Sequence, residues 1–82
     1  MLLNVINAEY INDYKIKIFF DNGFNKIVDL KNTIFNDNRK IFEPLKSIDY
    51  FKNFSIKLNT ITWENELDLA PEYLFNLWKK YI

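Results

Sequence analysis

The only glycine of this chain, Gly23, follows Asn22 and is flanked by two runs that alternate apolar and polar residues, 14–20 and 24–30. An alternation of period two is typical of a strand with one buried face. Ile27 breaks the alternation. Asn-Gly favours a type I′ turn, because that turn needs positive φ at both central positions. The pattern therefore predicts an antiparallel hairpin that turns at Asn22 and Gly23.

Three further strands are predicted from the same kind of evidence. Residues 2–8 are apolar and β-branched enough for a first strand. Residues 54–58 and 61–64 alternate again, and we place the turn between them at Asn59-Thr60. In this reading Phe54, Ile56 and Leu58 share one face of their strand, and Ile61 and Trp63 share a face of the next.

Two segments have the spacing of helices. Residues 44–53 begin with a proline and carry apolar residues three apart, which predicts a short helix. Pro71 opens a second helix predicted to run to about residue 81, with its apolar stripe at Leu74, Phe75, Trp78, Tyr81 and Ile82. We expect residues 31–43 to form a long connection that two pairs of apolar residues anchor to the core. The fold expected is a single α+β domain over 1–82, in two layers. It has a mainly antiparallel sheet of about five strands, a short helix near 44–53 and a C-terminal helix near 71–81.

Composition narrows the chemistry available to the chain. Its 82 residues include 15 aromatics, which provide a large apolar area for so short a sequence. There is no cysteine and no histidine, so disulfides, thiolate metal sites and the commonest neutral-pH general base are all excluded. We expect no cofactor and no enzymatic activity. No signal peptide and no membrane-spanning run is recognisable, so a cytoplasmic protein is expected.

Charge argues against a general affinity for nucleic acid. Eleven basic and eleven acidic residues give a formal net charge of zero, whereas nucleic-acid modules usually carry a positive excess. A basic stripe with Phe19 between two of its lysines could still bind single strands. The alternative role of such lysines is to guard exposed sheet surfaces against aggregation. The stripe would consist of Lys15, Lys17, Lys26 and Lys57.

Four carboxylates, at Glu64, Glu66, Asp68 and Glu72, follow the second hairpin with no basic residue among them. One reading is a divalent-cation site, because oxygen ligands suit Mg²⁺ or Ca²⁺. The alternative, which we favour, is a solvated loop that leads into a helix whose N-terminal dipole favours negative charge. In that case Asp68 would serve as the helix N-cap.

The C-terminal helix carries Tyr73 and Leu77 beside its main stripe, so its apolar arc is wide. These additional apolar side chains either cover more of the core or form an exposed patch for a partner. With Lys80 these two residues are the candidate partner-binding positions. The two tryptophans, Trp63 and Trp78, are expected in the core.

The chain also resembles a family of small bacterial proteins known as domain of unknown function 2442. The resemblance covers nearly the whole chain, and its most specific part is the tail that begins at Trp63 and ends in a Pro71-containing run. Glu64 stands where that family usually has proline, and Glu66 and Asn59 stand where it usually has glycine. The matching segments are Phe20-Asp21-Asn22-Gly23, Val28-Asp29-Leu30, Phe42-Glu43-Pro44-Leu45, Ile61-Thr62-Trp63 and Asn65 to Phe75.

The resemblance implies a compact α+β fold and no known activity. Members of that family are often encoded beside another small protein, which implies an antitoxin-like or regulatory partner role. We therefore expect a non-enzymatic protein-interaction module that binds a partner or itself through its terminal helix or a sheet edge. A nucleic-acid-associated regulator is the alternative, and a divalent-metal-dependent enzyme is a weaker one.

Overall fold

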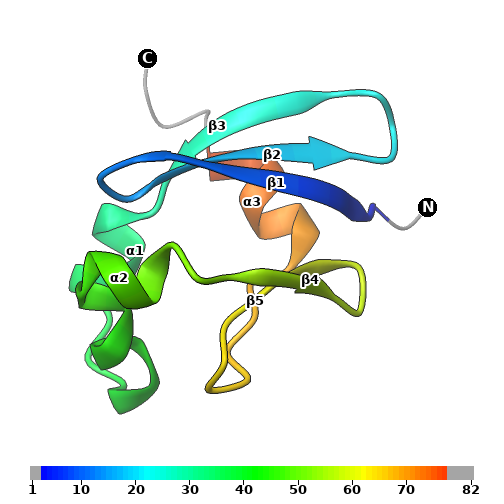
Figure 1. The fold of residues 1–82 in the computed structure, drawn as a ribbon. Coiled ribbons are helices and arrows are strands. Elements are labelled where there is room, and N and C mark those ends of the chain that lie inside the picture. The colour runs from blue at the N-terminus through cyan, green and yellow to red at the C-terminus, as the bar shows by residue number, and fades with distance from the viewer. Residues whose placement is uncertain (1–2, 78–82) are drawn as a thin grey trace.

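The computed structural model describes residues 3–77. Its elements form an α+β fold, as the sequence predicts (Figure 1). In chain order they are β1 (Val5–Asn12), β2 (Lys15–Phe20), β3 (Asn25–Asp29), α1 (Lys31–Phe35), the 3₁₀ helix η1 (Lys40–Lys46), α2 (Ile48–Phe51), β4 (Ser55–Lys57), β5 (Thr60–Thr62) and α3 (Pro71–Leu77).

The five strands are all antiparallel to their neighbours, and they form two sheets instead of one. The large sheet has the order β1-β2-β3, and the small sheet pairs β4 with β5. A bridge between Thr62 and Asp68 adds a further pairing beside β5. Figure 1 shows the large sheet as one layer, with the helices and the small sheet on one of its faces. The opposite face carries no other described element.

The core lies between these two layers. Alternate residues of β2 point into it, and Ile16, Ile18 and Phe20 are buried, as the alternation predicts. Trp63 lies opposite them, and its indole Nε1 donates a hydrogen bond of 2.7 Å to the carbonyl oxygen of Phe51. The largest fully buried side chains are Trp63, Phe20, Phe51, Ile16, Ile18, Leu30, Ile34, Leu45, Ile61, Leu74, Val5 and Val28.

The N-terminal strand begins and ends later than predicted, at residues 5 and 12 instead of 2 and 8. A hairpin joins it to β2, because Asn12 pairs with Lys15 across a two-residue turn in which Asp13 has a φ of 51°. Asp tolerates this left-handed conformation. The alternation in β1 is obscured by two register shifts, which explains why its boundaries are not visible in the sequence.

The middle of the chain is more helical than predicted. Residues 31–35 form α1, inside the segment expected to be an irregular connection. The helix predicted over 44–53 is divided into η1 and α2, because Ser47 adopts an extended conformation with a ψ of 126°. Pro44 lies inside η1 and not at its first residue.

Both hairpin turns differ in detail from the sequence prediction. At the first, only Gly23 has positive φ, so the predicted type I′ turn is wrong. At the second, the turn residues are Leu58 and Asn59, with φ of 52° and 71°, and this turn has the positive φ values of type I′. Leu58, expected on the inner face, is exposed because the turn comes one residue earlier. Ile56, expected on the same face, is 36% exposed although it pairs with the buried Ile61.

Candidate functional site

Two hairpin turns meet at one end of the molecule, where the segment before β1 ties them together. The backbone N–H and side-chain amide of Asn4 donate to the carboxylate of Asp21, at 3.2 and 2.7 Å. The N–H of Asp21 donates back to the carbonyl of Asn4 at 2.9 Å. The N–H of Val5 donates to the carbonyl of Asn59 at 2.9 Å, which attaches the small sheet to β1. The Asn4 contacts also lower the pKa of the Asp21 carboxyl below its ordinary value.

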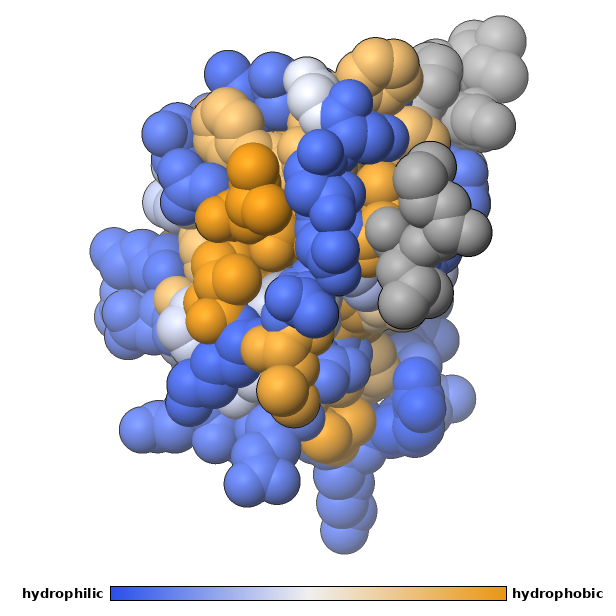
Figure 2. All heavy atoms as spheres, turned by 90° about the vertical axis from the view of Figure 1, so that its right-hand side faces the viewer, coloured by the Kyte–Doolittle hydropathy of each residue, from blue (hydrophilic) through white to orange (hydrophobic). Residues whose placement is uncertain are grey.

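The three most exposed large apolar side chains of residues 3–77 belong to this end. Leu58 is 90% exposed, Ile6 is 62% exposed and Phe24 is 57% exposed. Figure 2 views the molecule from this side and shows apolar side chains on both sides of a polar column. We call Ile6, Phe24 and Leu58 the turn-end surface. Exposed apolar groups that gather at one end of a molecule mark binding sites more often than single ones do.

Leu58 is the unusual member of the turn-end surface. Its φ of 52° places a branched side chain in the left-handed region, where the Cβ atom of an L residue meets the following carbonyl. Asparagine, aspartate and glycine are the usual residues of a type I′ turn. Because 90% of the leucine is exposed, burial within this chain does not offset the unfavourable backbone conformation.

A groove of about 660 Å³ runs from Leu58 across the outer side of the small sheet. It contains three carboxylates and a single ammonium group. No ion pair joins any of these four groups to another residue in the described part of the chain. The groove therefore carries an uncompensated negative charge. Its lining residues are Lys57, Leu58, Thr62, Trp63, Glu64, Glu66 and Asp68.

The four acidic candidates of the sequence analysis are divided between two places. Glu64, Glu66 and Asp68 line the groove, whereas Glu72 lies on α3, where its Oε2 accepts from the N–H of Leu3 at 3.4 Å. Within residues 3–77 no three acidic side chains are placed to hold one metal ion.

The predicted helix cap is not formed over the described range, because Asp68 makes no side-chain hydrogen bond there. Its backbone instead forms the bridge to Thr62. Pro71 is the first residue of α3, as predicted, and the N–H of Leu74 donates to the carbonyl of Ala70.

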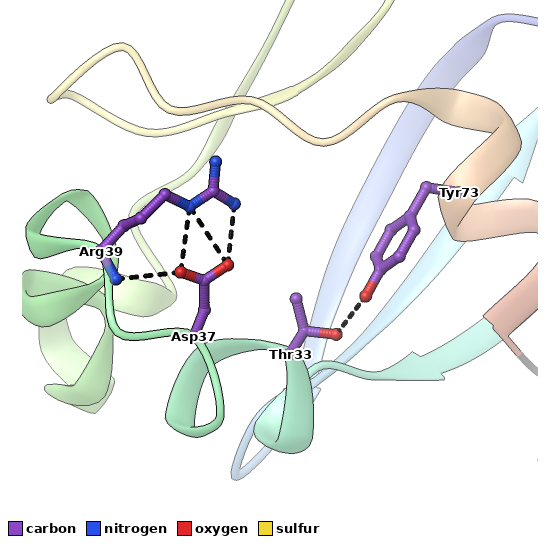
Figure 3. Close-up of polar contacts among 4 residues, drawn as sticks. All are labelled: Thr33, Asp37, Arg39 and Tyr73. Atoms are coloured by element: carbon purple, nitrogen blue, oxygen red, sulfur yellow. Dashed lines mark hydrogen bonds and ion pairs between the residues drawn. The ribbon is translucent and has the colours of Figure 1, made fainter.

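The partner-binding candidates on α3 have different surroundings. Tyr73 is 41% exposed, and its hydroxyl lies 2.7 Å from Oγ1 of Thr33 on α1 (Figure 3). Leu77 is only 5% exposed and belongs to the core, so it offers no surface here. Lys80 and Trp78 lie outside the described residues. Tyr73 and Leu77 border a polar hollow of about 310 Å³ between α1 and α3.

Comparison with known proteins gives one match. The model of the family described as "Protein of unknown function (DUF2442)" matches residues 5–80. The chain belongs to the DUF2442 family. No curated protein and no solved structure gives a significant match to it. Across residues 3–77, this DUF2442 member has no helix with the length and apolar character that crossing a membrane requires.

The single arginine of this DUF2442 protein has a local partner. Nη2 of Arg39 lies 2.7 Å from Oδ2 of Asp37, and its backbone N–H also donates to that carboxylate (Figure 3). These hydrogen bonds lower the pKa of Asp37 from 3.8 to about 2. The guanidinium also lies 5.2 Å from the ring centre of Phe42. The pair therefore fixes the connection between α1 and η1, which is a structural role.

The four lysines proposed as a stripe do not form one. Lys15 lies opposite Asp29 and Lys17 lies opposite Glu9 in the large sheet, so an acidic residue faces each. Lys26 is opposite the buried Ile18, which places it on the inner face, and its ammonium lies 4.8 Å from the ring centre of Phe75. The prediction that Lys26 points outward is wrong. Lys57 belongs to the other sheet.

Sequence reasoning missed the turn-end surface. The sequence predicts all three of its residues only as parts of strands, and it places Leu58 on the same face as Phe54 and Ile56. Leu58-Asn59 is not a typical turn dipeptide. The alternation of residues 54–58 favours a strand that includes Leu58 instead. Only the pairing of Lys57 with Thr60 reveals that Leu58 is a turn residue.

Proposed function

We propose that this DUF2442 protein is a protein-interaction module that binds a partner through the turn-end surface. The observation that carries the proposal is Leu58, which is 90% exposed in a backbone conformation unfavourable for leucine. Neither burial nor local propensity favours leucine there. Insertion into an apolar pocket of a partner would supply the missing burial, worth about 1.5–3 kcal/mol for a side chain of this size.

The surroundings of Leu58 support this surface over the sheet edges. Strand β1 carries two register shifts, and its Val5 N–H is already bonded to Asn59. At the opposite edge, Lys26 points inward from β3. Bulges and inward-pointing charges are features that oppose the pairing of exposed edges. The turn-end surface has no comparable protection.

The partner we favour is the product of a neighbouring gene, in an antitoxin-like or regulatory complex. This part of the proposal rests on the family resemblance. Self-association is the other form of the same activity, since a chain of zero net charge has little electrostatic repulsion between copies.

Size-exclusion chromatography with light scattering tests the proposal, on the protein alone and mixed with the neighbouring gene product. We expect a complex or a dimer with the unaltered chain, and a loss of about tenfold or more in affinity with Leu58→Asn. Asparagine suits the left-handed conformation, so this variant should fold at least as stably as the original.

The matched control is Ile27→Thr, which removes an exposed apolar side chain from the open face of the large sheet. Ile27 is 53% exposed and lies outside the turn-end surface. Binding should be unchanged in this control. A chain that stays monomeric with every neighbour, or one whose complex survives Leu58→Asn intact, would contradict the proposal.

A further inference from the structure

The groove beside Leu58 indicates what kind of partner the turn-end surface accepts. We propose that the docking segment is basic: an extended stretch of a partner protein that carries lysine or arginine side chains next to the apolar site for Leu58. This inference rests on the proposed function and specifies the partner of the same site. Charge complementarity between the groove and the segment is the physical basis.

Three acidic groups elsewhere in the described part of the chain are compensated by ion pairs, and those of the groove are not. Asp37 is paired with Arg39, Glu43 with Lys46 and Asp49 with Lys52. The three groove carboxylates have no such partner within residues 3–77, although Lys57 lines the same groove. Like charges gathered on one surface disfavour the isolated protein and attract a partner of the opposite sign.

The fold fixes the positions of these carboxylates. Glu64 and Glu66 belong to a tight turn in which the N–H of Glu66 donates to the carbonyl of Trp63 at 2.8 Å. Asp68 follows directly and is held beside β5 by the bridge to Thr62. A surface anchored in this way is preorganised, so little conformational entropy is lost when a segment binds.

Other occupants fit less well. A nucleic-acid backbone would bring phosphates against the carboxylates, which like-charge repulsion opposes. A single metal ion would need a cluster of oxygen ligands, and residues 3–77 contain no such arrangement. A segment with several separated cations matches carboxylates that are spread along a groove of about 660 Å³.

Fluorescence anisotropy with labelled octapeptides tests the inference. The probes alternate valine with lysine, with serine or with glutamate, so that they are cationic, neutral and anionic. We expect the lysine peptide to bind about tenfold or more tightly than the other two. Its affinity should fall when salt rises from about 50 to about 200 mM, because exposed charges are screened.

Two triple variants identify the surface responsible. The first neutralises the groove with Glu64→Gln, Glu66→Gln and Asp68→Asn, and it should abolish the preference for the lysine peptide. The matched control, Glu9→Gln with Glu43→Gln and Asp49→Asn, removes the same net charge elsewhere and should keep that preference. Absence of binding by the lysine peptide, or a preference that survives neutralisation of the groove, would overturn the inference.

The same variants separate this inference from the proposed function. A complex with the neighbouring gene product that tolerates the groove variant and is lost with Leu58→Asn refutes a basic partner and supports the interaction module. A complex that is insensitive to Leu58→Asn refutes the module itself.

Discussion

Two loops of this protein have the same hydrogen-bonding pattern but differ in the residue at the position with positive φ. In the first, the N–H of Gly23 donates to the carbonyl of Phe20, and Gly23 has a φ of 90°. In the second, the N–H of Glu66 donates to the carbonyl of Trp63, and Glu66 has a φ of 70°. In both, the preceding asparagine side chain accepts from the following N–H. Glycine is suited to the left-handed position and glutamate is not.

Substitutions at these two positions should have opposite effects on stability. We expect Glu66→Gly to raise the free energy of unfolding by about 0.5–1 kcal/mol, because it relieves the left-handed strain. Gly23→Ala should lower it by about 1 kcal/mol for the reverse reason, although a Cβ there meets no atom within 4 Å. Urea denaturation followed by circular dichroism measures both.

Glu64→Gly is the control for this pair, because Glu64 lies in the same loop without positive φ. It should destabilise the fold by the usual entropic cost of glycine. A Glu66→Gly variant as destabilised as this control would show that residue 66 carries no strain.

Individual residues were predictable where chemistry acts locally. Asn-Gly is a strong local signal, and it predicts Gly23 at its turn. Residues 54–58 contain only the alternation as a signal, and that alternation predicts an inward-facing Leu58. The turn that presents Leu58 also bonds to β1 through Val5 and Asn59, a contact between residues far apart in the chain.

At the scale of elements, Trp63 joins the small sheet to the helices. It follows β5 directly, is almost fully buried and donates to the carbonyl of Phe51 at the end of α2. Its ring centre lies 5.9 Å from that of Phe51. One side chain therefore contributes both apolar burial and a buried hydrogen bond between two short elements.

The variant Trp63→Phe should lower the free energy of unfolding by about 2–3 kcal/mol. It removes apolar volume and leaves the buried Phe51 carbonyl without its donor. Thermal unfolding followed by circular dichroism measures the loss. Phe54→Leu, at the half-buried neighbour of Trp63, should cost less than about 1.5 kcal/mol. Equal losses in the two variants would mean that the hydrogen bond contributes nothing.

Elements with a clean period were identified correctly, and the others were not. Strand β2 alternates regularly in its burial, and its hairpin with β3 is where the sequence places it. Helix α1 has only five residues, too few for a helical period to stand out. The division of 44–53 at Ser47 depends on tertiary packing, which propensity does not encode.

At the scale of the whole molecule, stability should decrease in acid. The pKa of Asp37 is lowered to about 2, and the pKa of Asp21 is lowered as well. Both carboxyls bind protons less readily in the folded than in the unfolded chain. Their contribution is therefore complete above about pH 4 and is lost as the pH falls towards 2.

Urea titrations at several pH values between about 2 and 5 measure this slope. The double variant Asp21→Asn with Asp37→Asn should flatten it. Leu58→Asn leaves every carboxylate in place and should keep it. An unchanged slope in the double variant would show that other carboxylates govern the acid transition.

The two-layer α+β architecture was predictable, because alternating strands and an amphipathic helix each have one apolar face, and they bury these faces by packing against each other. The division into two sheets was not, since pairing between distant strands leaves no local trace. The candidate site was hidden for the same reason: Ile6, Phe24 and Leu58 come from three separate segments. The acidic residues of the groove were noticed, but their grouping beside Leu58 required the fold.

The large sheet precedes, along the chain, the elements that cover it. A ribosome releases the three strands of the large sheet well before the residues that cover them. Until the second half of the chain emerges, the apolar face of the large sheet is exposed. Exposed apolar surface of this kind attracts chaperones. Stalled or shortened translation products of this gene would consequently be poor folders and ready substrates for quality control.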